Sequence, residues 1–388
     1  MSSLLDRSQR PVAFDCRHFL GDRPCTWHKR EQAVCNCDHY EPVQQRILII
    51  KLDAMGDVLR TTALLPPLTR AHPGASIAWM TRPEAAPLLQ HNPYLDEVIH
   101  YGADGLVQLQ ARRFDRVINL DAGKTSAGLA ALADAPRKDG FVLGDRGHVE
   151  PTNAAARRWL EMGLFDDLKR RNRRTYQDLM CDILGLEGAD HRYVLALTEL
   201  EHESGRKQLE NLGLDPARTI VGLNTGAGGR WPLKQWREDG FIELVDRLDQ
   251  LGSPQFLLLG GPDQAHRHAT IRNAVSADVR VAPTDLSVRI FAALVGACDV
   301  LVTGDTLAMH LALALERRVV VLFGPTSAAE IDLYQRGDKI LPSMDCLACY
   351  KTSCDYAPNC MDLIRVDAVT RSVMRQLTLS SASSRRAA

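Results

Sequence analysis

Two features that the 388-residue sequence lacks exclude large classes of protein. No apolar run approaches the roughly 18 residues that a membrane-spanning helix needs; the longest are short stretches such as Val319 to Phe323. The sequence has no excess of positive charge, because its 47 Lys and Arg residues are balanced by 48 Asp and Glu residues, which gives a net charge of −1. A dedicated nucleic-acid-binding protein would carry such an excess. We therefore expect neither a transmembrane protein nor a nucleic-acid partner.

The amino-terminal residues also lack an apolar core followed by a small-residue cleavage site, which is the pattern of a secretory signal. A cytoplasmic protein is therefore expected. The composition that remains is globular, with 45% hydrophobic and 24% charged residues. At roughly 100–200 residues per domain, the length predicts two domains and a small appendage.

Short β-branched runs alternate with longer amphipathic stretches, a pattern typical of parallel sheets covered by helices. We predict an α/β protein with two such domains. The expected strands of the first series are Arg46–Lys51, Ser76–Thr81, Glu97–His100 and Arg116–Leu120. Those of the second series are Thr219–Asn224, Gln255–Gly260, Val279–Ala282, Val300–Thr303 and Arg318–Phe323. The expected division is a Cys-rich amino-terminal extension (1–45), two domains (46–205 and 206–368), and a carboxyl-terminal helix and tail (369–388).

The loop after the first expected strand carries a glycine and two aspartates in the run ILIIKLDAMGDVLRT. Ligands of open α/β sheets bind at the carboxyl ends of strands. Gly56 would permit a tight turn there, and the Asp57 carboxylate would accept a proton from a hydroxyl group. The alternative is that Asp57 caps the helix expected from about Val58. Asp53 is a rival base.

A glycine-rich loop, TGAGGRWPLKQW, follows the expected strand that ends at Asn224. It places Thr225, Gly226, Arg230 and Lys234 just before an amphipathic stretch. Backbone amides at a helix start, together with a nearby cation, suit a phosphate group. The alternative is an ordinary glycine-rich turn between a strand and a helix.

A third loop, TGDTLAMH, ends at His310. Asp305 and Thr306 would begin a helix whose first amides hold a phosphate oxygen, with Asp305 directed at sugar hydroxyls and His310 on the same face as Thr306. The alternatives are that Asp305 is a helix cap and His310 a buried structural histidine. The GGPDQAH loop offers Asp263 for ribose recognition.

Four segments occur in a set order between Arg46 and Asp367: IKLDAMGDVLRTTALLPPL, MTRPEAAPLLQHNPYLDEVI, NTGAGGRWPLKQW and VTGDTLAMHLALAL. Together they resemble glycosyltransferase family 9, which contains the ADP-heptose lipopolysaccharide heptosyltransferases. The resemblance implies a GT-B architecture, in which two Rossmann-like domains face each other across a cleft. Residues 46–205 would then form the acceptor side, and residues 206–368 would hold the nucleotide-sugar donor.

The resemblance also implies roles for individual residues. Asp57 matches the aspartate of the family's Met-Gly-Asp-Val segment and would be the general base. Thr225 and Lys234 match a threonine and a lysine of the donor loop. The family's Gly-Asp-Thr segment and downstream histidine match Asp305, Thr306 and His310. Where several relatives offer a glutamate to the donor ribose, this chain has Asp263.

The activity implied is an inverting transfer of heptose from ADP-heptose to a hydroxyl of a cell-envelope glycan such as lipopolysaccharide core. Asp57 would deprotonate the acceptor as it attacks the anomeric carbon from the face opposite the diphosphate. Helix-start amides, Thr225, Thr306 and Lys234 would stabilise the leaving diphosphate. The expected chemistry therefore needs no divalent metal, and the donor loops carry no paired-carboxylate metal motif.

The acceptor side is marked more weakly. We expect acceptor contacts from Asp53, Arg82 and Lys124. The basic amphipathic stretch from Arg157 to Arg174 would contact anionic lipid or glycan, which favours a peripheral position at the inner face of the membrane. The alternative is a solvated helix face.

Ten cysteines are abundant for a cytoplasmic protein, where disulfides are rare. Eight of them form two groups, one before the first expected strand and one near the carboxyl terminus, which suggests structural zinc, an iron–sulfur cluster, or free thiols and disulfides. The groups are Cys16, Cys25, Cys35 and Cys37, and Cys346, Cys349, Cys354 and Cys360.

Two other functions compete with glycosyl transfer. A catalytically degenerate GT-B protein with metal-stapled termini would bind a partner instead of catalysing transfer. A nicotinamide-dependent oxidoreductase is disfavoured, because no Gly-x-Gly-x-x-Gly follows the strand expected at Arg46–Lys51.

Overall fold

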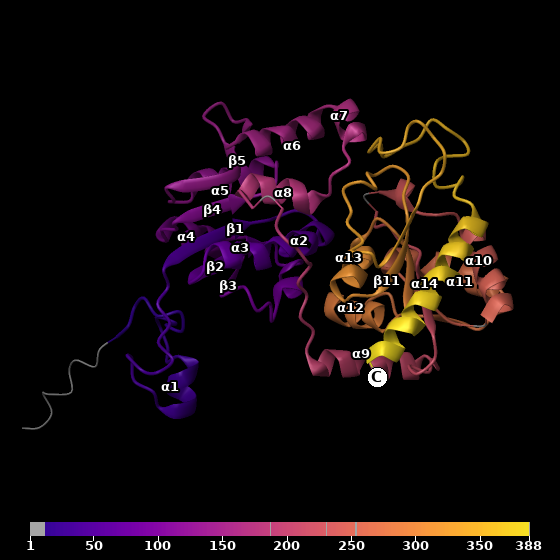
Figure 1. Ribbon diagram of the computed structural model, residues 1–388, viewed down its shortest axis with the longest axis horizontal. Helices are drawn as coiled ribbons and strands as arrows, with labels where there is room; N and C mark the ends of the chain where they lie inside the picture. The colour runs from indigo at the N-terminus through magenta and orange to yellow at the C-terminus, as the bar shows by residue number, and fades with distance from the viewer. Residues whose placement is uncertain (1–11, 187, 230, 253, 388) are drawn as a thin grey trace, which may run out of the picture. The chain divides into compact units, whose positions relative to one another are not determined.

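The structure is a computed structural model that describes residues 12–387 apart from residues 187, 230 and 253. Contacts divide the chain into two compact units (Figure 1). The first unit comprises the chain up to Leu52, residues 65–83 and residues 93–153. The second comprises residues 53–64, residues 84–92 and everything from Ala154 onward.

The first unit contains a six-stranded sheet in the order β3-β2-β1-β4-β5-β6. Its neighbours pair in parallel except β5 and β6, which are antiparallel. Four consecutive residues at the end of β1 are buried, as expected for a parallel strand covered on both faces. The strands are β1 (Gln45–Ile50), β2 (Ala75–Thr81), β3 (Glu97–His100), β4 (Arg116–Asn119), β5 (Arg137–Leu143) and β6 (Val149–Pro151). The helices are α1 (Thr26–Glu31), α3 (Leu65–Ala71), α4 (Ala103–Ala111) and α5 (Lys124–Leu132).

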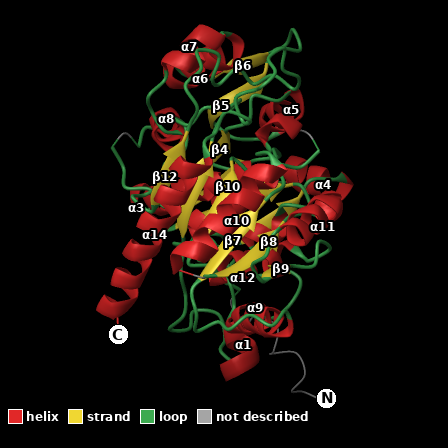
Figure 2. Cartoon of the chain, turned by 90° about the vertical axis from the view of Figure 1, so that its right-hand side faces the viewer, coloured by secondary structure: helices red, strands yellow, loops and turns green. Residues whose placement is uncertain are grey.

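The second unit contains a six-stranded, all-parallel sheet in the order β12-β11-β10-β7-β8-β9. Its strands are β7 (Ile220–Asn224), β8 (Gln255–Leu259), β9 (Val279–Val281), β10 (Val300–Gly304), β11 (Arg318–Leu322) and β12 (Gly337–Ile340). One face packs on α9 (Glu199–Asn211), α12 (Val288–Ala297) and α13 (Leu307–Ala314). The other packs on α10 (Glu238–Gly252), α11 (Ala265–Ala274) and α14 (Val366–Ala387) (Figure 2). Further helices are α6 (Ala154–Leu164), α7 (Asp166–Arg171) and α8 (Tyr176–Leu184).

A short helix from early in the chain completes the second unit. Immediately after β1, the chain forms α2 (Met55–Thr61) and the 3-10 turn η1 (Thr62–Leu64). Leu59 and Ala63 from this segment are buried in the same apolar cluster as residues of α12 and α13. The packing places the first turn of α2, which carries Asp57, within the second unit.

The predicted α/β class is confirmed, and all nine expected strands are present within one residue at each end. Three strands were not predicted. The segment that forms β12, GDKI, has no apolar run and stays half-buried at a sheet edge, while β6 has only three residues. β5 contains Gly140 with φ +99° and begins with charged residues, so it does not have the β-branched pattern of a strand.

The predicted domain limits at residues 45, 205 and 368 stay predictions. Residues 154–205 belong to the same compact unit as the second sheet. Among the residues that the structure describes, no helix has both the length and the apolar character to cross a bilayer.

Candidate functional site

Asp57 lies in the first turn of α2 and makes an ion pair within that helix. Its carboxylate Oδ1 is 2.7 Å from a guanidinium nitrogen of Arg60, and about 30% of the Asp57 side chain is exposed. The residue that precedes the helix as its cap is Ala54, and no side chain caps this end. The interpretation of Asp57 as a helix cap is therefore wrong, because its carboxylate engages Arg60 and not the amides of the helix start.

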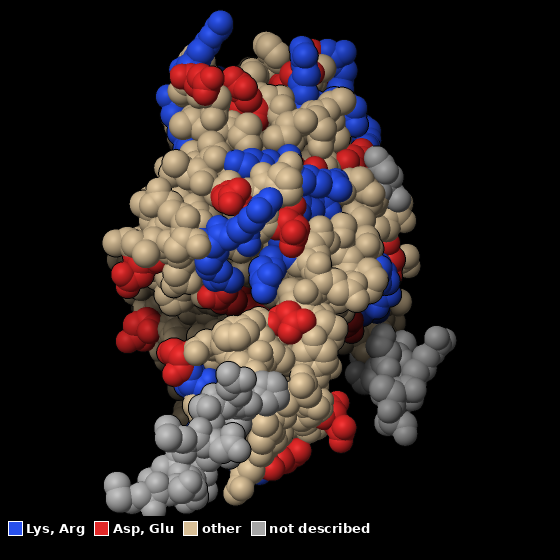
Figure 3. Space-filling view, turned by 90° about the vertical axis from the view of Figure 1, so that its left-hand side faces the viewer, with Lys and Arg blue, Asp and Glu red and all other residues tan. Residues whose placement is uncertain are grey.

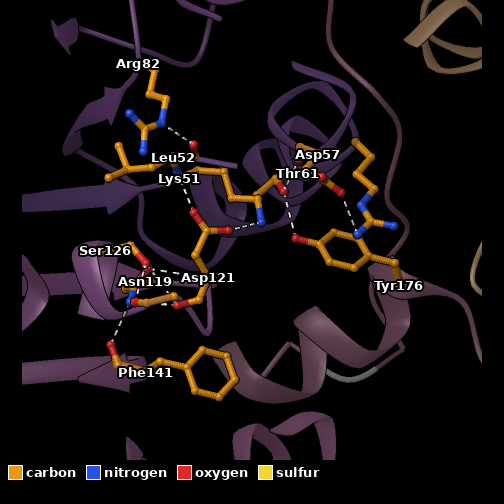
Figure 4. A network of polar contacts seen from close by, with 12 residues as sticks. Lys51, Leu52, Asp57, Thr61, Arg82, Asn119, Asp121, Ser126, Phe141 and Tyr176 are labelled. Carbon is orange, nitrogen blue, oxygen red and sulfur yellow. Dashed lines mark hydrogen bonds and ion pairs between the residues drawn. The ribbon is translucent and has the colours of Figure 1, made fainter. Parts of the chain in front are cut away.

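Arg60 connects Asp57 to an aromatic platform. Its guanidinium lies 3.8 Å from the centre of the Tyr176 ring, a cation–π contact. The Tyr176 hydroxyl is 2.8 Å from the Thr61 hydroxyl, and Figure 4 shows Asp57 and Thr61 beside this ring. Burial alone would lower the pKa of Arg60. Neighbouring groups, among them the carboxylates of Asp57 and Glu330, have a larger and opposite effect, so the pKa is raised. Arg60 therefore holds a permanent positive charge next to Asp57.

Glu330 supplies a second, buried carboxyl group to this region. Only 8% of the residue is exposed, and the Tyr350 hydroxyl donates to its Oε1 at 3.3 Å. Its main-chain carbonyl accepts the Tyr176 N–H at 2.9 Å, at the start of α8. Burial raises the pKa of Glu330, and the charge of Arg60 opposes that rise. Arg60, Tyr176 and Glu330 are not predicted from the sequence, because no local motif connects them.

His310, on α13, packs directly against α2. A Cβ atom at Gly56 would lie 2.8 Å from His310 Cδ2, so only glycine permits this approach. The Tyr193 hydroxyl is 3.2 Å from the ring Nδ1. Burial lowers the pKa of His310 to about 4, although Asp305 opposes the shift, so the ring is neutral at neutral pH. The interpretation of Gly56 as a tight-turn residue is wrong: it permits close packing of two helices.

Lys234 and Asp305 form an ion pair at the amino-terminal end of α13. Lys234 Nζ lies 2.9 Å from a carboxylate oxygen of Asp305 and 3.0 Å from its carbonyl oxygen. Both side chains are about 15% exposed. Burial would raise the pKa of Asp305, but the Lys234 ammonium outweighs it and lowers that pKa. Asp305 is not the helix cap, because α13 begins after Thr306.

The loops after β7 and β10 are joined by Asn224. Its amide Nδ2 donates to the hydroxyls of Thr303 and Thr306 at 3.0 and 3.2 Å and to the Gly226 carbonyl at 3.2 Å. No side chain of the described chain caps the start of α13, so its first amides have no such partner. Thr306 and the helix-start amides thus lie together at this end of α13.

The remaining predicted donor residues differ in exposure. Thr225 is buried, and its hydroxyl is 2.9 Å from Nε2 of His268. Asp263 is exposed in the 3-10 turn η4 (Pro262–Gln264), where it accepts a hydrogen bond from the Gln264 side chain at 3.0 Å. Arg230 lies outside the described residues.

A separate polar network occupies the carboxyl ends of β1 and β4 in the first unit (Figure 4). Buried Asp121 pairs with Lys51 and accepts the Leu52 N–H at 2.6 Å. Arg82 donates to the Leu52 carbonyl at 3.0 Å, and its guanidinium lies 5.3 Å from the centre of the Tyr101 ring. This network orders the segment that leads into α2. Of the predicted acceptor residues, Arg82 and Lys124 are exposed in this unit, and Asp53 is exposed at the start of the second.

The basic stretch forms α6, α7 and the turn after them. We define the basic surface as Arg157, Arg158, Leu164, Phe165, Arg170, Arg171 and Arg173, which are all exposed. Asp166 and Asp167 are exposed in the same stretch, and Arg157 and Arg171 pair with Glu161 and Asp167. Leu164 and Phe165 are 66% and 53% exposed, which is unusual for large apolar side chains. Elsewhere, Figure 3 shows Lys and Arg side chains interspersed with Asp and Glu across one face of the molecule. The surface thus offers both positive charge and apolar contacts.

All ten cysteines are free of disulfides. The carboxyl-terminal group lies between β12 and α14, where Cys360 is buried; burial and the neighbouring Cys346, Cys349 and Cys354 raise its pKa to about 11. Across residues 12–387 as described, no group of three or more His, Cys, Asp or Glu side chains is arranged to hold a metal ion. The predicted metal sites therefore have no support from coordination geometry.

Comparisons with known proteins agree with one another. Residues 106–359 match the model of glycosyltransferase family 9 (heptosyltransferase). The chain is 26% identical over 302 residues to lipopolysaccharide heptosyltransferase 2 of Salmonella typhimurium, covering 73% of this chain and 83% of that protein.

Two solved structures show the same GT-B fold of two parallel-sheet α/β domains. A family 9 glycosyltransferase from Veillonella parvula has a TM-score of 0.72 at 21% identity, covering 86% of this chain and 97% of that one. ADP-heptose lipopolysaccharide heptosyltransferase II of E. coli has a TM-score of 0.65 at 22% identity, covering 87% and 99%.

Because the folded-state pKa of His310 is depressed to about 4, the unfolded chain binds a proton that the folded chain excludes between about pH 6.5 and pH 4. The free energy of unfolding should therefore fall by about 2 kcal/mol from this residue as the pH drops from 7.5 to 5. Urea unfolding at both pH values measures the loss. His310→Gln should remove that share of the pH dependence. An equal pH dependence in both proteins would show that His310 is not held neutral.

Proposed function

Because the chain belongs to glycosyltransferase family 9, the heptosyltransferase family, we propose that it transfers heptose from ADP-heptose to a hydroxyl of a cell-envelope glycan such as lipopolysaccharide core. The name of the Salmonella relative supports the lipopolysaccharide acceptor, and that of the E. coli structure supports the ADP-heptose donor. The observation that carries the proposal in this chain is the partly exposed Asp57 carboxylate, paired with Arg60 on α2, next to Gly56, which packs on His310 of α13. The Lys234–Asp305 ion pair lies at the start of the same helix α13.

Asp57 is the general base in this proposal. One of its oxygens, Oδ1, contacts Arg60, so we assign Oδ2 to the acceptor hydroxyl. Arg60 in turn is oriented by its stacking on Tyr176. As the acceptor oxygen attacks the anomeric carbon, Oδ2 takes its proton, and the diphosphate leaves from the opposite face. A single displacement of this kind inverts the anomeric centre.

The leaving diphosphate is stabilised by Lys234, by the Thr306 hydroxyl and by the uncapped amides at the start of α13. Because Lys234 pairs with Asp305, the ammonium group offsets the negative charge of the Asp305 carboxylate. Without this pairing, the carboxylate would repel the diphosphate. These donors supply positive charge where negative charge develops, so we propose chemistry without a divalent metal. Asp305 then faces sugar hydroxyls, and exposed Asp263 is assigned to the ribose.

Asp53, Arg82 and Lys124 are assigned to the acceptor. Each is exposed and follows a strand of the first sheet along the chain, at the edge where α/β proteins bind ligands. A glycan that carries phosphate or carboxylate groups would pair with the two cations.

The basic surface is assigned to anionic lipid at the inner face of the membrane, since it combines arginines with exposed Leu164 and Phe165.

Replacing the base should abolish turnover without abolishing donor binding. We expect Asp57→Asn to lower kcat by about 10²–10⁴-fold, because the amide cannot accept the proton. ADP-heptose turnover with a heptose-deficient core acceptor measures kcat.

Arg60→Met should lower kcat by about 10–100-fold through misplacement of the Asp57 carboxylate.

Asp367→Asn is the matched control, because Asp367 also pairs with an arginine on an exposed helix face. Its kcat should be unchanged. Full turnover by Asp57→Asn would eliminate Asp57 as the base, and full turnover by Arg60→Met would eliminate its positioning role.

Donor binding should depend on Lys234. Thermal unfolding with ADP, GDP, UDP and CMP should show selective stabilisation by ADP, because a ligand that binds only the folded state raises Tm. Lys234→Ala should weaken ADP binding by about 10–100-fold through loss of a charge-assisted contact. Lys207→Ala, on the exposed face of α9, is the control. A response to another nucleotide would change the donor, and no response to any would favour a degenerate binding protein.

The basic surface should bind anionic vesicles. Sedimentation with phosphatidylglycerol vesicles should retain the protein at low salt, and neutral phosphatidylcholine vesicles should not. The double variant Arg170→Ala, Arg173→Ala should bind at least tenfold more weakly, as should Phe165→Ser. Leu200→Ser is the control, because Leu200 is 74% exposed on α9. Equal binding of all four proteins would place lipid contact elsewhere.

A further inference from the structure

Residues 12–46 fold without a buried side chain. The segment forms α1, and two long-range backbone hydrogen bonds close it: Arg17 N–H to the Glu41 carbonyl and Val43 N–H to the Asp15 carbonyl, both at 2.8 Å. Burial begins only at Ile47 in β1. Ordering each residue costs roughly 1–2 kcal/mol of conformational entropy, which apolar burial normally offsets. A segment of this size without a core usually depends on disulfides or a metal.

The same segment lines a pocket of about 280 Å³ that is partly open to solvent. Its wall is drawn entirely from residues 12–40 and includes every cysteine and histidine of the segment. No Asp or Glu side chain lines it among the described residues. Hard cations such as Ca²⁺ and Mg²⁺ prefer carboxylate oxygens, whereas zinc and iron–sulfur clusters prefer thiolates. The wall therefore has the chemistry of a site for a thiophilic metal.

Two of the three histidines of the wall, His28 and His39, have partners that orient their rings. His28 Nδ1 lies 2.8 Å from the Ala33 carbonyl, and His39 stacks on Trp27 at 3.7 Å while contacting Glu31 at 2.9 Å. The four cysteines are free of disulfides, and Cys25 Sγ accepts the His28 N–H at 3.4 Å, a contact that stabilises a thiolate. The cysteines are thus the main candidate ligands, and His18 Nε2, which is buried without a hydrogen-bond partner in the described chain, is a further one.

We propose that Cys16, Cys25, Cys35 and Cys37 hold a thiolate-ligated metal centre that replaces the missing core of the segment. The centre is zinc or an iron–sulfur cluster, which share this ligand chemistry. The thiols line the pocket and do not meet at one point, so a cluster would span it, whereas a single ion would draw the thiols inward. This inference does not depend on the proposed glycosyl transfer.

The attachment of the segment indicates what the metal stabilises. Arg17, next to Cys16, pairs with Asp96 at 2.5 Å and donates to the Ala75 carbonyl at 2.7 Å, both at the start of neighbouring strands. Metal binding would hold Arg17 in place and so dock the segment on the first sheet. Loss of the metal should loosen residues 12–44 and leave the two sheets folded.

The test is elemental analysis of the full chain purified without oxygen or chelators. Zinc, iron and acid-labile sulfide are measured for the wild type and for two double variants, Cys35→Ser, Cys37→Ser and Cys346→Ser, Cys349→Ser. We expect the first variant to lose the metal and the second to retain it. Zinc without sulfide identifies a single ion, and iron with sulfide identifies a cluster. A metal-free wild type, or metal lost only from the carboxyl-terminal variant, would overturn the proposal.

Limited trypsin digestion tests the structural role. Lys29 and Arg30 are exposed on α1 and should be cut at least tenfold faster in the Cys35→Ser, Cys37→Ser variant than in the wild type. An unchanged main thermal transition shows that the sheets remain folded. Equal rates of cleavage in the two proteins would refute the metal as the element that holds this segment.

Discussion

The close contact between Gly56 and the His310 ring determines where the carboxylate of Asp57, the proposed base, lies. It lets α2, which follows a strand of the first unit, pack into the second unit against α13. A single added methyl group would stand 2.8 Å from the ring and push the helices apart. Because Asp57 is the next residue, its position relative to Lys234 and the start of α13 depends on this contact. His310 is a spacer as well as a candidate ligand contact.

Around that contact, charges are compensated in pairs. Asp57 is matched by Arg60, and Asp305 by Lys234, while Glu330 lies close to Arg60. Separating any pair would leave a charge partly desolvated, which costs several kcal/mol. Burial is the main cause of the depressed pKa of His310; the charges of Arg60 and Lys234 lower that pKa further, and the carboxylates of Asp305 and Asp57 oppose the shift. A donor diphosphate would therefore enter a region whose cations are already oriented.

The sequence was sufficient for the parts of the molecule that local pattern determines. Strands such as β7 and β10 are buried along their whole length, and Lys234 follows β7 while Asp305 and His310 follow β10, at the edge that α/β proteins use. It was insufficient where distant segments decide the structure. Arg60 looked like an ordinary helix residue, and only its packing on Tyr176 gives it a role. β12 has no apolar run and forms because β11 offers it an edge.

The most direct test is the stereochemistry of the transferred sugar. The enzyme is supplied with ADP-heptose of known anomeric configuration and a heptose-deficient lipopolysaccharide core, and the anomeric proton of the product is observed by NMR. If Asp57 acts as the base in one displacement, the product should have the inverted configuration only. Retention of configuration would contradict that mechanism, and the absence of any transferred heptose would contradict the proposed activity itself.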